Sequence, residues 1–131
     1  MATRAQITRA LTLVVEDIVS QIGSKAIPAL RDATPKDTRY HSSRWVGRAG
    51  GPPARRTTPA GRAGRAIALS FSQQDASITA LRNYRLVQGN IFIINDGNYI
   101  GVLDRREGRF VDRELIALAA RIQPRRVIRL R

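Results

Sequence analysis

The feature that most constrains the fold is a long apolar stripe near the start of the chain. Apolar residues recur at intervals of three and four through residues 3–32, namely Ile7, Leu11, Val14, Ile18, Ile22, Ala26 and Leu30. These intervals place the side chains on one face of an α-helix. Thr3 is a suitable N-cap, whereas Gly23 and Pro28 weaken the second half of the helix. We therefore expect a helix over 3–32 with a kink, or a break into two helices, near residues 23–28.

A helix of this length needs a surface that covers its apolar stripe. Val15 and Val19 widen the stripe, which favours contacts on more than one side. The sequence leaves two candidates for the surface that covers the stripe. The simpler one is the protein's own sheet, and the other is a neighbouring subunit that shares the helix.

A turn separates this helix from the rest of the chain. Thr34 precedes Pro35 and ends the helix, because a residue before proline avoids the α region. Asp37 and Thr38 are residue types that bond nearby backbone groups and hold turns. Residues 40–46, which carry Trp45, are predicted to form a strand.

Residues 47–66 are rich in glycine, proline and arginine, contain no acidic residue and show no hydrophobic period. Such a segment cannot bury enough apolar surface to fold alone. A structureless loop of this length is uncommon in a small domain and is usually functional or disordered. We interpret it as a flexible basic arm that becomes ordered on a partner, with a solvated loop as the alternative.

The remaining chain is predicted to form a strand-rich core over 67–122. Its expected elements are a strand or helix lead-in at 67–72, a helix at 74–83, a strand at 84–87, a strand at 91–94 and a final helix at 111–122. Asp96-Gly97 is a strong hairpin cue, and residues 99–103 either continue as a strand or begin a helix. The basic tail, 123–131, alternates apolar residues with arginine, which predicts either an exposed strand that pairs with another chain or a frayed terminus.

These elements predict one α+β domain over residues 1–131. A long N-terminal helix and a C-terminal helix would pack on a small, mostly antiparallel sheet, from which the long extended basic arm emerges. The chain has no cysteine, so disulfides and thiolate metal sites are excluded. The N-terminus carries no long apolar run, so we expect neither a secretory signal nor a membrane span.

The charge of the chain predicts an anionic partner. Lysine and arginine number 23 against 10 acidic residues, giving a net charge of +13, and all but Lys25 and Lys36 of these basic residues are arginines. Residues 39–66 hold seven arginines and no acid, counting Arg39 and Arg44, and such clusters bind phosphate without reading sequence. Our candidate contact residues for DNA or an acidic partner are Arg48, Arg55, Arg56, Arg62, Arg65, Arg125, Arg126, Arg129 and Arg131.

The residues do not favour an enzyme. His41 is the only histidine, so the usual histidine and cysteine metal clusters cannot form. Ser42 and Ser43 adjoin it, but adjacent residues of a strand face opposite sides and do not build a catalytic triad. Gly61-Arg62-Ala63-Gly64 lacks the lysine of a phosphate-binding loop. We therefore expect no catalytic residue, no metal and no cofactor.

Two blocks of the sequence carry a resemblance to a known family. The first is Thr34-Pro35-Lys36-Asp37-Thr38, followed by Trp45 and then by Gly50-Gly51-Pro52-Pro53. The second is Ile91-Phe92-Ile93-Ile94-Asn95-Asp96 with Tyr99 and Leu103, followed by Gly108-Arg109-Phe110-Val111. In this order and spacing, over residues 30–122, they resemble the neck or tail-completion (head–tail joining) proteins of long-tailed bacteriophages, the minor tail protein Z-like group. The chain departs from the family pattern at Arg39, where glycine is expected, and at Arg44, where a small polar residue is expected.

The resemblance implies a structural virion protein that forms a closed ring in the neck, joins the tail to the head connector and lets DNA pass. Sixfold symmetry is expected by analogy with tail rings, with twelvefold as the alternative. The implied partners are other copies of the chain, the neighbouring neck, connector and tail-tube proteins, and DNA in the lumen. It also implies structural roles, which we expect to be packing within the chain, for Thr34, Pro35, Asp37, Thr38, Trp45, Asn95, Tyr99 and Leu103. The alternative function is that of a small basic nucleic-acid-binding or ribosome-associated protein.

Overall fold

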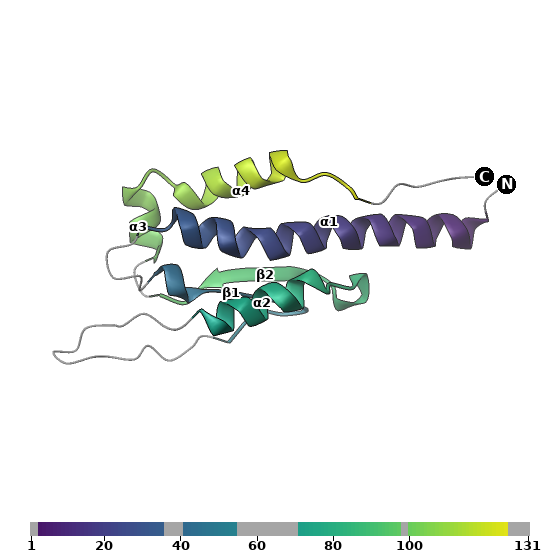
Figure 1. Ribbon diagram of the computed structural model, residues 1–131, viewed down its shortest axis with the longest axis horizontal. Coiled ribbons are helices and arrows are strands. Elements are labelled where there is room, and N and C mark those ends of the chain that lie inside the picture. Colours follow the sequence, from purple (N-terminus) through teal and green to yellow (C-terminus); the bar gives the residue numbers. More distant parts are fainter. Residues whose placement is uncertain (1–2, 36–40, 55–70, 98–99, 126–131) are drawn as a thin grey trace.

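The protein has an α+β fold built around one long helix (Figure 1). The computed structural model describes residues 3–35, 41–54, 71–97 and 100–125. The elements in chain order are α1 (Arg4–Ala33), the 3₁₀ turn η1 (Ser42–Arg44), β1 (Trp45–Ala49), α2 (Ser72–Arg82), the 3₁₀ turn η3 (Leu86–Gln88), β2 (Ile91–Asn95), α3 (Ile100–Arg106) and α4 (Phe110–Arg121). Figure 1 shows α4 along one side of α1, with the sheet and α2 on the other.

Helix α1 is a single helix from Arg4 to Ala33, so the predicted break into two helices is wrong. A capping box fixes its start, where the Thr3 hydroxyl accepts from the Gln6 amide and the Gln6 side chain accepts from the Thr3 amide. Pro28 costs about 3 kcal/mol in a helix interior. The adjacent Ile27 is fully buried, and burial of such a side chain contributes about 1.5–3 kcal/mol, so tertiary packing offsets the proline.

Only the second half of α1 is covered by the rest of the described structure. The buried residues of the helix begin at Asp17 and continue to Leu30. In the first half, the side chains of Leu11 and Val15 are 49% and 41% exposed. The apolar stripe is therefore packed within the chain along half of its length, and Figure 1 shows the other half extending beyond the body of the protein.

Strands β1 and β2 pair antiparallel, with Trp45 opposite Asn95 and Ala49 opposite Ile91. The sheet packs against α1 and α2, which also contact each other, and the core of Ile27, Leu30, Trp45, Leu81 and Phe110 includes a residue of α4. Gly47 permits this close packing, because a Cβ atom at that position would lie 2.7 Å from the Leu81 Cδ1 atom. A larger residue would therefore require the Leu81 side chain of α2 to shift.

The structure corrects two strand predictions and the start of the predicted arm. The strand expected at 40–46 begins only at Trp45 and runs to Ala49, because residues 42–44 form a buried 3₁₀ turn. The first three residues of the predicted arm, 47–49, therefore belong to the sheet. Residues 84–87 are not a strand, since η3 occupies 86–88 and the Gln88 side chain accepts from the Arg85 amide.

The region 67–122 is not strand-rich in its described part, which holds β2 and three α-helices. Asp96-Gly97 does not form a hairpin: β2 is followed by α3, so residues 100–103 are helical. The helices predicted at 74–83 and 111–122 and the strand at 91–94 are confirmed with small shifts of their ends. Residues 55–66 of the arm, 67–70 of the predicted strand or helix lead-in, and 126–131 of the tail lie outside the described residues.

Among the described residues, no helix is both long enough and apolar enough to cross a membrane.

Candidate functional site: a buried junction, a tail clamp and a surface groove

The two sequence blocks meet at a buried junction between the end of α1 and the start of the sheet. The indole Nε1 of Trp45 donates to the Thr34 hydroxyl at 2.8 Å, and that hydroxyl donates to the Leu30 carbonyl at 2.6 Å. Thr34 and Trp45 are 1% and 4% exposed. Because the bond joins the C-cap of α1 to the first residue of β1, it fixes the angle between helix and sheet.

Asn95 joins the second block to the same junction. Its side-chain amide donates to the His41 carbonyl at 2.8 Å, and its side-chain oxygen accepts from the Gly97 amide at 2.9 Å. The sheet register places Asn95 directly opposite Trp45. Asn95 therefore ends β2 and holds the segment before η1 in one arrangement.

A buried ion pair completes the junction. Arg44 is fully buried, and its Nη1 atom lies 3.8 Å from the Asp96 carboxylate. The Asp96 amide also donates to the Arg44 carbonyl at 3.2 Å. Gln74 of α2, also fully buried, donates to the Ser42 carbonyl. Removing one partner of such a pair leaves an uncompensated buried charge, so Arg44 and Asp96 have to be present together.

The structure thus brings together Thr34, Trp45 and Asn95, three of the residues that the resemblance singled out. Pro35, which follows the junction, and Leu103 in α3 are half-buried. Asp37, Thr38 and Tyr99 lie outside the described residues. In this structure the three junction residues make their hydrogen bonds within the chain.

A second polar cluster, which we call the tail clamp, joins Asp17 and Gln21 of α1 to Gln123 and Arg125 at the end of the described chain. The Asp17 carboxylate accepts from the backbone amide of Arg125 at 2.7 Å and from its Nε at 2.9 Å, and the Arg125 Nη2 atom lies 2.8 Å away. The Gln21 amide donates to the Gln123 carbonyl at 2.9 Å. Arg125 was predicted to contact DNA or a partner, but in this structure its charge is paired with a carboxylate of its own chain.

These contacts determine the protonation of Asp17, whose side chain is 6% exposed. Burial has the largest single effect on the pKa of Asp17 and raises it. The hydrogen bonds from Arg125 and Gln21 and the charge of Arg125 outweigh burial together, so the pKa lies below the ordinary 3.8. Asp17 is therefore ionised at neutral pH and holds the C-terminal segment.

The other predicted arginine contacts are only partly described. Arg48 lies exposed on β1, which keeps it a candidate. Arg44, which we counted in the basic cluster, is buried in the junction and is not accessible to phosphate. Arg55, Arg56, Arg62, Arg65, Arg126, Arg129 and Arg131 lie outside the described residues.

Sequence reasoning missed a groove between α1 and α2. It is a cavity of about 540 Å³ whose lining includes the cations Lys25, Arg82 and Arg125, the carboxylate Asp75, and the apolar Pro28 and Ile78. These residues come from three distant parts of the chain, so no local motif marks them.

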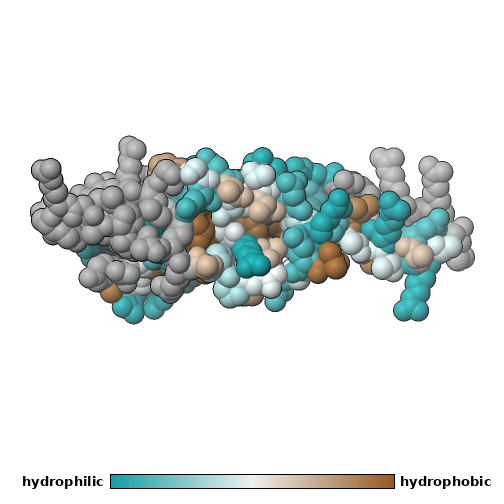
Figure 2. All heavy atoms as spheres, turned by 90° about the horizontal axis from the view of Figure 1, so that it is seen from below, coloured by the Kyte–Doolittle hydropathy of each residue, from teal (hydrophilic) through white to brown (hydrophobic). Residues whose placement is uncertain are grey.

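Two groups of exposed apolar residues lie outside the core. We call Leu11, Val15, Leu86 and Val87 the α1 face, because the Leu86 amide donates to Glu16 of α1 at 2.7 Å and so places η3 beside the first half of the helix. We call Val102, Leu115 and Ile116 the α4 face. Figure 2 shows apolar side chains among hydrophilic ones on the part formed by the first half of α1.

Within the described ranges, acidic and histidine side chains do not gather in groups of three or more that a metal ion would need. Comparison of the chain with protein-family models, with curated proteins and with solved structures finds no match.

Proposed function

We propose that the protein is a structural virion protein of a tailed bacteriophage that assembles as a closed ring in the neck. In this position it would join the tail to the head connector and let DNA pass. The other members of the assembly would be the neighbouring neck, connector and tail-tube proteins. The protein would act in the virion, after assembly in the host cell.

The buried junction supports the proposal. The resemblance rests on two blocks separated by the 37 residues 54–90, and Thr34, Trp45 and Asn95 from these blocks share one hydrogen-bonded cluster. A chance similarity of short motifs has no reason to place their key residues together. The cluster also explains why a threonine, a tryptophan and an asparagine are needed at these positions.

The observation that carries the assembly itself is the pair of unlike apolar faces. In the α1 face, Leu11 is 49% and Val87 is 93% exposed, and in the α4 face Val102 is 56% and Ile116 is 70% exposed. Exposed apolar surface rimmed by polar residues marks interaction sites. If the α1 face of one copy packs on the α4 face of the next, the contact is heterologous, and heterologous contacts close into rings when the rotation permits.

Native mass spectrometry and negative-stain microscopy of the purified protein test this proposal. We expect one closed ring, sixfold by analogy with tail rings or twelvefold, formed alone or with purified tails or connectors. A protein that stays monomeric and never joins these partners would refute it. Steep, salt-dependent affinity of the monomer for DNA or RNA would instead favour a nucleic-acid-binding protein.

Two variants distinguish a head-to-tail contact from self-pairing of one face. Leu11→Gln with Val15→Gln disables the α1 face, and Val102→Gln with Ile116→Gln disables the α4 face. Each variant alone should be monomeric. Mixed, they should form a heterodimer and nothing larger, since the mixture offers one intact α1 face and one intact α4 face per pair.

The mixing experiment has two contrary outcomes. A variant of the α4 face that still dimerises by itself would indicate pairing of two α1 faces, which does not build a ring. Two variants that both assemble normally would remove these faces from the assembly. Circular dichroism of each variant serves as the control for folding, and the exposure of the four side chains makes a loss of fold an unexpected result.

A further inference from the structure

The groove between α1 and α2 has the dimensions and the lining of a binding site. Its volume of about 540 Å³ falls within the range of about 300–1,000 Å³ that is typical of ligand sites. Helix α1 contributes Lys25 and Pro28, α2 contributes Asp75, Ile78 and Arg82, and the segment after α4 contributes Arg125. Three separate parts of the chain therefore build one surface.

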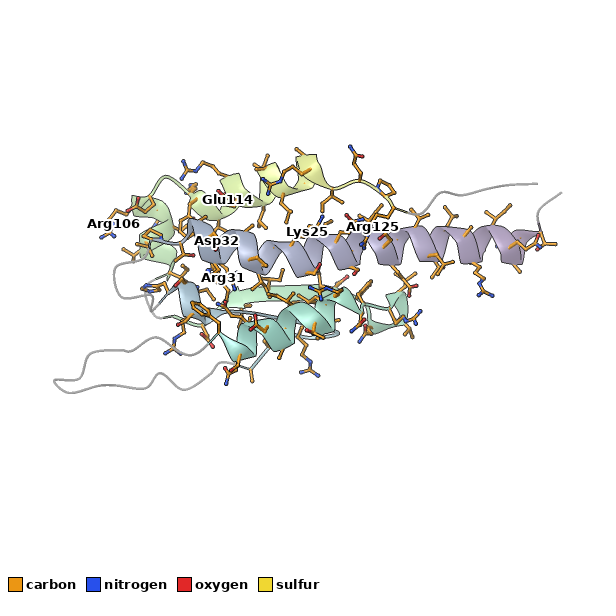
Figure 3. All side chains as sticks on the ribbon, in the orientation of Figure 1. Lys25, Arg31, Asp32, Arg106, Glu114 and Arg125 are labelled. Atoms are coloured by element: carbon orange, nitrogen blue, oxygen red, sulfur yellow. The ribbon has the colours of Figure 1, made fainter. Side chains whose placement is uncertain are left out.

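The lining of the groove carries more positive than negative charge, with Lys25, Arg82 and Arg125 against Asp75. Lys25 and Arg82 are exposed and have no ion-pair partner among the described residues, whereas Arg125 is held in place by Asp17. Figure 3 shows Lys25 and Arg125 beside each other along α1. The groove therefore attracts an anionic group. Its Arg125 side is held in place by Asp17 without any ligand.

The remaining lining identifies the class of ligand. Pro28 and Ile78 are half-buried apolar residues, which favour a ligand with an apolar side chain. Asp75 adds an exposed carboxylate, which can accept a hydrogen bond from a donor of the ligand. A phosphodiester backbone brings negative charge but neither donors nor apolar groups. A peptide segment brings an acidic side chain, an apolar side chain and backbone N–H donors together.

We propose that the groove binds an acidic, partly apolar peptide segment of a partner protein. A carboxylate of the segment lies between Lys25 and Arg82, an adjacent apolar side chain packs on Pro28 and Ile78, and a backbone N–H donates to Asp75. The site is separate from both apolar faces. Binding at the groove therefore does not depend on ring formation. It would connect this protein to a partner that is not another copy of the same chain.

The test measures binding of a short fluorescein-labelled peptide of alternating glutamate and leucine by fluorescence anisotropy. The variants Lys25→Gln and Arg82→Gln each remove one charge from the groove. The matched control is Arg106→Gln, which removes one charge from α3; its exposed pairing with Glu107 contributes little. Figure 3 shows Arg106 far from Lys25 and Arg125.

We expect each groove variant to weaken binding by about tenfold, a typical effect of losing one charge-assisted bond, and the control to change it by less than about twofold. A peptide in which glutamine replaces glutamate should not bind. Amide shifts in the NMR spectrum should cluster in α1 around residue 25 and in α2.

Two results would overturn the proposal. If groove and control variants weaken binding equally, the peptide responds only to net charge. If a single-stranded oligonucleotide of equal charge binds more tightly and loses its affinity in the same groove variants, the site takes phosphate instead. Ring formation by Lys25→Gln is measured in parallel, so failure of the groove and failure of the ring are seen separately.

Discussion

Replacement of Thr34 by valine tests whether the junction holds α1 on the sheet. Valine keeps the shape of threonine but removes the hydroxyl that accepts from Trp45 at 2.8 Å. The Leu30 carbonyl loses the hydroxyl bond but still accepts from the backbone amide of residue 34 at 3.0 Å. The main consequence is a buried indole N–H without an acceptor.

The expected cost follows from that one donor. A buried donor left without a partner costs about 1–3 kcal/mol. Unfolding entropy is about 2.1 cal/mol/K per residue, so each kcal/mol corresponds to roughly 4 °C for a chain of 131 residues. Thr34→Val should therefore lower the free energy of unfolding by about 1–3 kcal/mol and the Tm by about 4–10 °C.

Urea and thermal unfolding, followed by circular dichroism, measure the effect of Thr34→Val in the wild type and in the Trp45→Phe variant. Trp45→Phe removes the donor, so Thr34→Val should be nearly neutral in that background, because replacing both partners leaves nothing unpaired. Thr12→Val is the matched control: Thr12 donates to the Thr8 carbonyl at 2.9 Å with the same spacing, but in an exposed turn. It should change stability by less than about 0.5 kcal/mol.

Equal costs of Thr34→Val in the two backgrounds would refute the reasoning. So would a cost below about 0.5 kcal/mol with Trp45 in place. Either result would mean that apolar packing alone holds this end of the sheet.

Three further perturbations address the clamp, the junction and the close packing of the sheet. Asp17→Asn removes a carboxylate whose pKa is lowered in the folded protein. The stabilisation that this carboxylate provides is present above pH 3.8 and is lost as the pH falls. Below about pH 4 the Tm of the wild type should therefore fall more steeply with pH than the Tm of the variant. Burial, and then the charge of Arg44, lower the pKa of His41, so an NMR titration should give a pKa below 6.5, and stability should decline as the pH falls below 6.5; a pKa at or above 6.5 would contradict this. Gly47→Ala should cost about 1–3 kcal/mol in urea unfolding because its Cβ meets α2, whereas Gly51→Ala, with nothing within 4 Å, should be neutral.

The sequence predicts a helix or strand well where one hydrophobic pattern extends along the whole element. The stripe from Ile7 to Leu30 predicted α1 nearly to its ends, and the apolar run at 91–94 predicted β2. Near residues 23–28 we expected a kink or a break into two helices, and the break is excluded by the single helix Arg4–Ala33. Helix propensity is local, whereas the burial that keeps the helix intact comes from the sheet and α2. The strand at 40–46 failed for a similar reason, since Ser42, Ser43 and Arg44 are buried in a 3₁₀ turn.

The site was less predictable than the fold because it depends on register and on distant contacts. The motifs singled out Thr34, Trp45 and Asn95, but only the antiparallel pairing of β1 with β2 brings Asn95 opposite Trp45. The groove depends on contacts between α1, α2 and the segment that Asp17 fastens, and a linear pattern carries no trace of such contacts. Arginine counting misled in one respect, because Arg44 is buried and paired inside the chain.

Salt separates the two proposed contacts. Every copy carries a net charge of +13, so two copies repel each other while their apolar faces attract. The screening length falls from about 10 Å at 0.1 M salt to about 3 Å at 1 M, so added salt should remove the repulsion and promote the ring. A peptide held between Lys25 and Arg82 should instead dissociate, because salt screens its attraction. Analytical ultracentrifugation and anisotropy over the same salt series should therefore give opposite trends; rings that dissociate in salt would mean that charge, and not the apolar faces, holds the copies together.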